Sequence, residues 1–135
     1  MSSPAVQLPH LTLLFAACCA LFQVALTALV IARRVKTEIR FLEGGDAVLL
    51  HRIRAHGNFT ETVPMALLLM ALLELRGLGS AWLWAFGAAL LLGRALHVHG
   101  LLSVNAKWAR VAGMLATLAV ISTEALAGLW MHLAR

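Results

Sequence analysis

The run LTLLFAACCALFQVALTALVIA, residues 11–32, contains no charged side chain. A helix needs roughly 20 apolar residues to cross the hydrocarbon core of a bilayer, so this run predicts a membrane-spanning helix. No lysine or arginine precedes it, whereas Arg33, Arg34 and Lys36 follow it directly. A secretory signal peptide has basic residues before a shorter apolar stretch. We therefore interpret residues 11–32 as a helix that the protein retains.

Three further apolar runs of membrane length follow, at about residues 47–75, 81–103 and 108–133. Turn-forming residues separate the runs, at 43–46, 76–80 and 103–106. The chain is 61% hydrophobic and 13% charged, with a mean hydropathy of +0.87, which is far too apolar for a soluble globular domain. The sequence thus predicts an all-α membrane protein in which residues 1–135 form a single domain, a bundle of four transmembrane helices.

Lysine and arginine are unevenly distributed between the predicted connections. Six of them surround the first connection, at Arg33, Arg34, Lys36, Arg40, Arg52 and Arg54. The second connection has only Arg76, whereas Lys107 and Arg110 lie near the third. Because cytoplasmic loops are enriched in basic residues, we expect the first and third connections in the cytoplasm and both termini outside. The formal charge of +5 follows from this topology and favours contact with membrane lipid headgroups. Basic and aromatic residues are not interleaved, so we expect no nucleic-acid partner.

The stretch Arg54-Ala-His56-Gly-Asn58-Phe-Thr-Glu61-Thr-Val-Pro64 places polar groups inside the second apolar run. A charged residue at the centre of a membrane helix costs roughly 2.5 to 3.5 kcal/mol on insertion scales, so such a cluster indicates a function. Arg54, Asn58 and Glu61 follow the i, i+4, i+7 spacing of one helix face. Arginine binds a carboxylate in a fork, glutamate binds an ammonium, and asparagine both donates and accepts. This face therefore suits a zwitterionic, peptide-like ligand. Pro64 either kinks the helix beyond the cluster and widens a cavity, or is simply tolerated.

A second group of polar residues falls in the third run. Arg94 and His97 are three residues apart and share a face, whereas His99 points elsewhere. The two histidines make a weak metal motif without a thiolate or carboxylate nearby in the sequence, so we expect no metal site. A buried arginine needs a counter-charge, and we expect Arg94 to pair with Glu61 of the second run.

In the fourth run, Arg110, Thr117 and Glu124 repeat at heptad spacing, which predicts a single stripe along the helix. Arg110 begins this stripe at the cytoplasmic end. There it is either part of a site or an anchor for lipid headgroups.

Together these motifs resemble the family of membrane-associated proteins in eicosanoid and glutathione metabolism. The resemblance rests on the stretch from Arg54 to Pro64, on Arg94-x-x-His97 and on Arg110 thirteen positions later, and it covers essentially the whole chain. The compact bacterial members are the most similar. The resemblance implies a homotrimer of four-helix subunits in a bacterial inner membrane, with sites between neighbouring subunits that open toward the cytoplasm.

The resemblance also implies a ligand and a set of site residues. Glutathione would be the thiol co-substrate, and the family's binding residues match Arg54, Asn58, Glu61 and His97. In relatives a basic residue that ends the first helix contributes as well, for which Arg34 or Arg33 is the candidate. Arg110 matches the family's fourth-helix arginine near the glutathione thiol and is the predicted catalytic residue. A guanidinium there favours the thiolate, which is the form that attacks.

The chain departs from the family's eicosanoid-forming enzymes at the corresponding positions. Those enzymes have a tyrosine one turn after the histidine and another after the catalytic arginine, where this chain has Leu101 and Met114. The serine that follows the catalytic arginine in the prostaglandin synthase is Val111 here. The chain has no tyrosine at all, so several hydrogen bonds to glutathione are missing. These differences weaken the case that the protein forms prostaglandins or leukotrienes.

Three functions remain open. The first is an integral membrane glutathione-dependent transferase or peroxidase, which acts on lipophilic electrophiles or lipid hydroperoxides that enter from the bilayer. The second is a non-catalytic membrane protein of the same fold that binds lipid or serves as a scaffold. The third is a proton-coupled carrier that uses Glu61, His97 and Glu124. Arg110 favours the enzyme.

Overall fold

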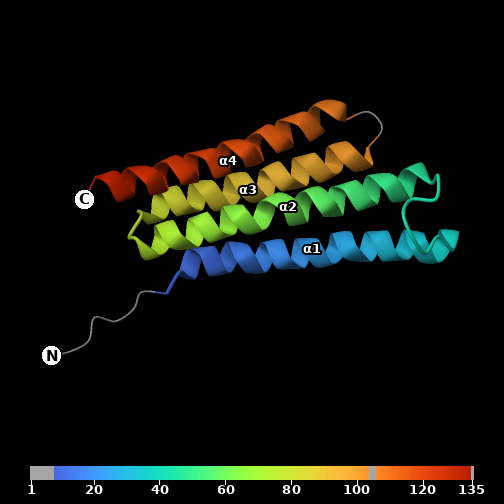
Figure 1. Cartoon of the computed structure of the whole chain (residues 1–135), viewed down its shortest axis with the longest axis horizontal. Coiled ribbons are helices and arrows are strands. Elements are labelled where there is room, and N and C mark those ends of the chain that lie inside the picture. The colour runs from blue at the N-terminus through green and yellow to red at the C-terminus, as the bar shows by residue number, and fades with distance from the viewer. Residues whose placement is uncertain (1–7, 104–105, 135) are drawn as a thin grey trace.

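A computed structural model describes residues 8–103 and 106–134, which form four α-helices. The helices are α1 (His10–Thr37), α2 (Ala47–Leu75), α3 (Ser80–Leu102) and α4 (Lys107–Leu133). They run side by side in alternating directions, with the α1–α2 and α3–α4 connections at one end and the α2–α3 turn at the other (Figure 1). All four are long and apolar enough to cross a membrane. The predicted all-α bundle of four transmembrane helices is confirmed.

The helix bounds agree with the predicted spans to within a few residues, except at the end of α1. That helix continues for five residues beyond the apolar run, through Arg33 and Arg34 to Thr37. The predicted turn at 103–106 includes residues 104 and 105, which lie outside the described residues. Pro64 does not end α2, which continues to Leu75.

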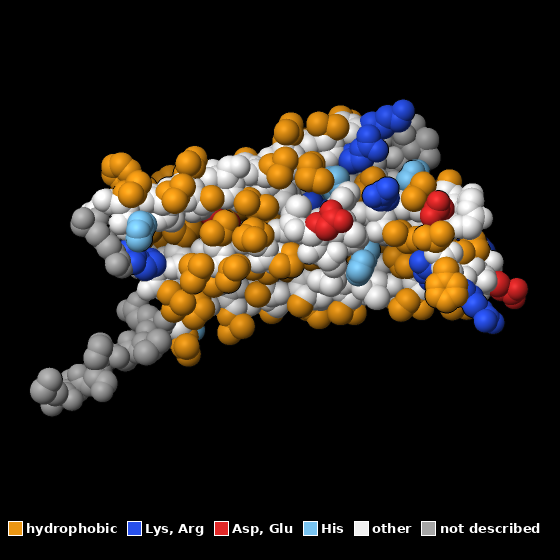
Figure 2. Space-filling view, in the orientation of Figure 1, with side chains coloured by type: hydrophobic (Ala, Val, Ile, Leu, Met, Phe, Trp, Pro, Cys, Tyr) orange, Lys and Arg blue, Asp and Glu red, His pale blue; other side chains and the backbone are white. Residues whose placement is uncertain are grey.

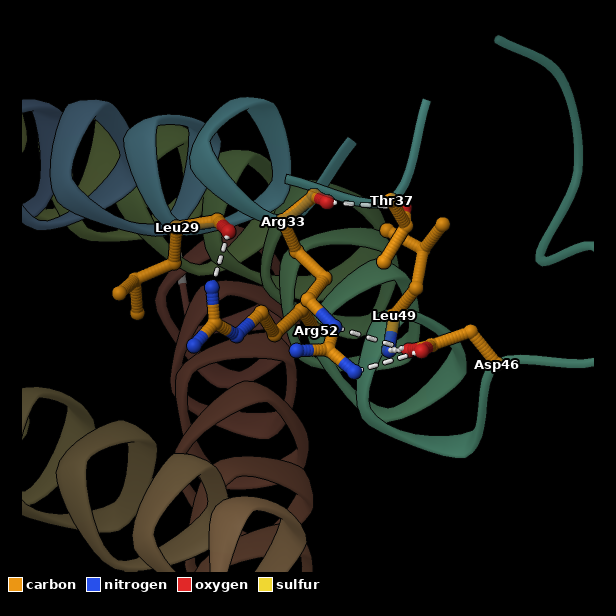
Figure 3. A network of polar contacts seen from close by, with 6 residues as sticks. All are labelled: Leu29, Arg33, Thr37, Asp46, Leu49 and Arg52. Atoms are coloured by element: carbon orange, nitrogen blue, oxygen red, sulfur yellow. Dashed lines mark hydrogen bonds and ion pairs between the residues drawn. The ribbon is translucent and has the colours of Figure 1, made fainter. Parts of the chain in front are cut away.

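A network of polar contacts joins α1 to the beginning of α2 (Figure 3). Asp46 precedes α2 and accepts a hydrogen bond from the backbone N–H of Leu49 at 2.6 Å, which caps the helix. The same carboxylate accepts from Nε and Nη2 of Arg33 at 3.1 and 2.6 Å, and this fork holds the pKa of Asp46 below its usual range. Arg52 adds a bond from Nη1 to the carbonyl oxygen of Leu29 at 2.7 Å. The start of α2, where the polar stretch lies, is thus held in register against α1.

At the opposite end, Glu74 of α2 caps the first turn of α1. The backbone N–H groups of Leu11 and Thr12 donate to its carboxylate at 2.9 and 2.8 Å, and the Thr12 hydroxyl donates at 2.7 Å. Pro9, which precedes α1, has no side-chain donor or acceptor to cap it. Glu74 therefore supplies from a neighbouring helix what the local sequence lacks.

Helices α3 and α4 touch through glycines. A Cβ added to Gly113 would meet the carbonyl oxygen of Gly93 and the backbone nitrogen of His97, and one added to Gly100 would meet the backbone nitrogen of Arg110. Small residues let membrane helices approach to backbone contact, since lipid tails provide no hydrophobic force between helices. This close approach fixes the position of α4 relative to α3.

The predicted pair between Arg94 and Glu61 is wrong. Arg94 is fully buried, and its guanidinium lies over the ring of Phe59, with 5.7 Å from Cζ to the ring centroid. No described residue accepts a hydrogen bond from it. Glu61 is exposed on the outside of α2, so the two side chains point in different directions. Residue spacing shows which residues share a face of one helix, but it does not show how two helices are rotated relative to each other. The pairing of Arg94 with Glu61 depends on that rotation.

The predicted stripe on α4 is only partly correct. Thr117 and Glu124 are fully buried in the bundle, but Arg110 is exposed. Arg110 lies in the first turn of α4, at the end of the bundle, and its side chain is exposed there although it follows the same spacing. The carboxylate of Glu124 has no hydrogen-bond donor among the described residues.

Candidate functional site

A cavity of about 540 Å³ opens between α2, α3 and α4, near the end that carries the α1–α2 and α3–α4 connections. Its walls come from the beginning of α2, the end of α3 and the beginning of α4. The lining residues are Leu50, His51, Arg54, Asn58, His97, Leu101, Arg110, Val111, Met114 and Leu115. Basic and histidine side chains gather toward this end of the molecule, whereas hydrophobic ones cover most of its length (Figure 2).

Helix α2 contributes Arg54 and Asn58, which lie one turn apart and face the same cavity as predicted. The cap at Asp46 sets where this helix begins. Glu61 lies on the same helical face, one turn deeper in the membrane, but it is exposed and does not line the cavity. Within one chain, the predicted trio is therefore reduced to a guanidinium and an amide.

His97 connects the three helices of the cavity. Its ring is almost fully buried, at 3% exposure. Nδ1 lies 2.8 Å from the backbone carbonyl oxygen of Arg110 in α4, and Nε2 lies 3.1 Å from Nδ2 of Asn58 in α2. Both ring nitrogens are thus engaged in hydrogen bonds within the bundle. That occupation leaves neither nitrogen free for a metal ion.

The guanidinium groups of Arg54 and Arg110 give the cavity its charge. Neither forms a hydrogen bond or ion pair with any residue in 8–103 or 106–134. No carboxylate is among the lining residues. Two unpaired cations at the edge of a low-dielectric bundle attract anionic groups strongly, and arginine matches carboxylates in geometry. The cavity is therefore suited to a ligand that carries at least one acidic group.

The opposite wall of the cavity is apolar. Val111 and Leu115 on α4 are 53% and 61% exposed, so this wall continues onto the outer surface of the bundle. Leu101 and Met114, at the positions where tyrosines were missing in the sequence, also line it. The cavity thus joins a cationic end to an apolar side that continues on the outer surface.

The basic residues at the end of α1 do not reach this cavity in their own chain. Arg33 is paired with Asp46, and Arg34 donates from Nη1 to the carbonyl oxygens of Ile39 and Leu42 at 3.3 and 3.1 Å. Arg34 lines a different groove, between α1 and α2.

The residues predicted for a proton-coupled carrier are also dispersed. His97 lines the cavity, Glu61 lies on the outer surface and Glu124 lies in the bundle interior. The structure therefore brings together Arg54, Asn58, His97 and Arg110 alone among the predicted site residues.

One polar lining residue was missed by the sequence reasoning. His51 lies one turn before Arg54, is exposed and lines the cavity. Its spacing of three residues from Arg54 and seven from Asn58 puts it on the same face by the rule that selected the other two. The helical spacing that identifies Arg54 and Asn58 therefore also identifies His51.

Four membrane-length helices, with a cavity lined by two arginines at one end of the bundle, define an integral membrane protein. Among known families, the model of the MAPEG family, the membrane-associated proteins in eicosanoid and glutathione metabolism, matches residues 12–130. The chain therefore belongs to that family. The resemblance drawn from the motifs is confirmed.

Two curated relatives are both inner membrane proteins named YecN, from Escherichia coli K12 and Escherichia coli O6:H1. Each is 34% identical over 101 residues, which is 75% of this chain and 76% of the relative. No solved structure gives a significant match.

Proposed function

We propose that this protein is an inner-membrane enzyme that binds glutathione, or another small acidic thiol, and uses it to conjugate lipophilic electrophiles or to reduce lipid hydroperoxides. The observation that carries the proposal is the cavity with two guanidinium groups, of Arg54 and Arg110, that pair with no described residue, and with an apolar wall that continues onto the outer surface. Such an enzyme would serve detoxification.

The donor set fits glutathione as a substrate. Glutathione has two carboxylates, one ammonium and a thiol, so its acidic groups match a cavity lined by cations. Arg54 binds a carboxylate through its planar fork. Arg110 favours the thiolate, and the thiol proton passes to water at the cavity mouth. In conjugation, the sulfur forms a bond to an electrophilic carbon while the leaving group departs with its electron pair.

The apolar wall supports a substrate that arrives from the bilayer. A lipophilic electrophile that moves along Val111 and Leu115 reaches the cavity beside Arg110 without crossing water. In the reduction of a hydroperoxide, two thiols become a disulfide, and the peroxide becomes an alcohol and water. The basic residues at this end support a cytoplasmic position for the cavity, on the side where thiols are kept reduced.

We further propose that the protein is a homotrimer. Glu61 lies at the midpoint of α2 and is exposed, so a monomer would present a carboxylate to the hydrocarbon core. That exposure costs roughly 3 kcal/mol on insertion scales unless another subunit covers the group. A second copy could also bring its own Arg34 near the cavity. Native mass spectrometry in mild detergent tests the assembly, and a predominantly monomeric species would contradict it.

A second candidate function is lipid binding without catalysis. It is favoured by Leu101 and Met114, which give the cavity apolar side chains where the family's eicosanoid-forming enzymes have tyrosine hydroxyl groups. A lipid with an acidic headgroup would place that group at Arg54 and its chains along the apolar wall.

Replacement of Arg110 separates the two functions. In Arg110→Ala, glutathione should still protect the protein from thermal unfolding through Arg54, but conjugation of chlorodinitrobenzene should fall about tenfold for each pKa unit of thiolate stabilisation that is lost. Arg110→Lys should lie between, because it keeps the charge without the fork. Lys107→Ala is the matched control, since Lys107 is an exposed basic residue one turn away that does not line the cavity. Unchanged conjugation in Arg110→Ala would make Arg110 a headgroup anchor.

A further inference from the structure

The connection between α1 and α2, residues 38–46, exposes two large hydrophobic side chains. Phe41 is 83% exposed and Leu42, the next residue, is 78% exposed. Exposed hydrophobic residues are ordinary on a helix that faces lipid, but these two belong to no helix. Adjacent apolar side chains outside the spans mark a surface that contacts something apolar.

The backbone of the connection holds this pair outward. Arg34 donates from Nη1 to the carbonyl oxygens of Ile39 and Leu42, at 3.3 and 3.1 Å, and so ties the two halves of the loop to one guanidinium. Leu42 has a φ of +52°, in the left-handed region that is uncommon for leucine. Ile39 packs against the backbone of Gly44 instead, since a Cβ added there would lie 2.9 Å from its Cδ1. The exposure of Phe41 and Leu42 thus belongs to a defined loop conformation.

The connection lies at the level of the lipid headgroups. The uncharged run of α1, residues 11–32, already has the length of the hydrocarbon core, so the residues that follow it fall in the headgroup layer. The ion pair between Arg33 and Asp46 holds the two ends of the connection together (Figure 3). The connection does not extend beyond the end of α1 (Figure 1). The exposed pair therefore stays close to the bilayer.

A basic side chain directly precedes the apolar pair. Arg40 is exposed and forms no hydrogen bond or ion pair with any residue in the described part of the chain. It lines a hollow of about 610 Å³ together with Arg34, Val35, Glu38 and Ile39. The planar guanidinium of arginine matches a phosphate, and the carboxylate of Glu38 accepts from an ammonium. The charges of this hollow therefore complement a phospholipid headgroup that carries both groups.

We propose that the α1–α2 connection is a lipid-binding loop, in which Phe41 and Leu42 enter the leaflet at this end of the bundle while Arg40 binds a phospholipid phosphate. Segments that lie in the membrane interface combine phenylalanine and leucine, which sink to the boundary between headgroups and acyl chains, with basic residues that stay among the headgroups. The inference goes beyond the proposed function, because none of the three residues lines the cavity.

Spin labels measure the depth of the loop in a bilayer. Phe41→Cys and Leu42→Cys are made separately in a Cys18→Ala background, in which the remaining Cys19 is buried and shielded from the reagent. Each variant is labelled with a nitroxide and reconstituted in nanodiscs of phosphatidylethanolamine and phosphatidylglycerol. Oxygen concentrates in the bilayer and a nickel chelate stays in water, so oxygen should relax both labels more strongly than nickel does.

Ser80→Cys in the same background is the matched control for the depth measurement. Ser80 is exposed where α3 begins, at the turn at the opposite end of the bundle. Nickel should relax a label there more strongly than oxygen does. The background without an added cysteine should take up almost no label.

The phosphate contact is tested by Arg40→Ala with the label at position 42. A hydrogen bond between charged groups favours the inserted loop by about tenfold, so the ratio of oxygen to nickel relaxation should fall several-fold without it. Lys36→Ala is the matched control, because Lys36 is an exposed basic residue near the loop that does not line the hollow. That variant should keep the ratio of the parent.

Three results would contradict the inference. Stronger relaxation by nickel at both loop positions would place Phe41 and Leu42 in water. Protection of both labels from oxygen and nickel alike would show that protein covers the pair, as in a contact with a second copy of the chain. An unchanged ratio in Arg40→Ala would overturn the phosphate contact.

Discussion

Replacing Gly113 by alanine tests whether backbone contact between α3 and α4 builds the cavity. A methyl group there would meet the carbonyl oxygen of Gly93 and the backbone nitrogen of His97, which cannot move aside as a flexible side chain can. Overpacking of this kind costs about 1 to 3 kcal/mol, and the higher helix propensity of alanine returns up to about 1 kcal/mol. We expect Gly113→Ala to lower the free energy of unfolding by about 1 to 2 kcal/mol.

The same substitution should also weaken glutathione binding. If α4 moves away from α3, the carbonyl oxygen of Arg110 moves away from Nδ1 of His97, and the bond of 2.8 Å between them is lost. Unfolding in mixed detergent, followed by tryptophan fluorescence, measures the stability, and calorimetry measures the binding.

Gly128 provides the control on the same helix. A Cβ added there would lie 4.0 Å from Cδ2 of Leu73, which is an ordinary contact. Gly128→Ala should therefore be neutral or stabilise the protein by up to about 1 kcal/mol. A Gly113→Ala variant as stable as Gly128→Ala, with unchanged glutathione affinity, would refute the close α3–α4 packing and its role in the cavity.

Further predictions concern the two ends and the interior of the bundle. Asp46→Asn keeps a capping oxygen but loses the ion pair with Arg33. Because that pair lowers the pKa of Asp46, the carboxylate stabilises the fold above its ordinary pKa of about 4, and the contribution is lost as the pH falls through the lowered value. Unfolding at several pH values should show this acid-dependent loss in the parent, and an equal loss in Asp46→Asn would contradict it. Glu74→Ala should cost about 1 to 2 kcal/mol of unfolding free energy, because three donors including the Thr12 hydroxyl lose their acceptor, and Glu74→Gln should cost less. Arg94→Met should equal or exceed the parent in stability, since it replaces a buried cation that has no hydrogen-bond partner among the described residues by an apolar chain of similar length. A loss above about 2 kcal/mol in the same assay would show that Arg94 has a stabilising partner.

The fold could be predicted from the sequence because the bilayer sets the length of each span. The uncharged run at 11–32 and the three later runs correspond to the observed helices. It was also predictable that Arg54 and Asn58 lie on the same face of α2, because this depends only on the helical period. The family resemblance pointed to His97 and Arg110, which no local pattern placed beside the second helix.

The remaining features depend on how whole helices are rotated and how closely they approach. Glu61 shares a helical face with Arg54, yet it is exposed and does not line the cavity. Arg94 faces the interior because of the rotation of α3, which residue spacing does not encode. The hydrogen bond between His97 and the backbone of Arg110 requires the glycine contacts of α3 and α4, which became apparent only in the three-dimensional arrangement.

The central claim is that Arg110 stabilises a bound thiolate in the cavity. The most direct measurement is the ultraviolet absorbance of the thiolate when glutathione is added to the purified protein near neutral pH. We predict that the absorbance rises and saturates at no more than one thiolate per subunit, that the rise is lost in Arg110→Ala, and that it persists in Lys107→Ala. Saturable glutathione binding without a rise in thiolate absorbance would contradict the claim and leave a protein that binds acidic ligands without activating them.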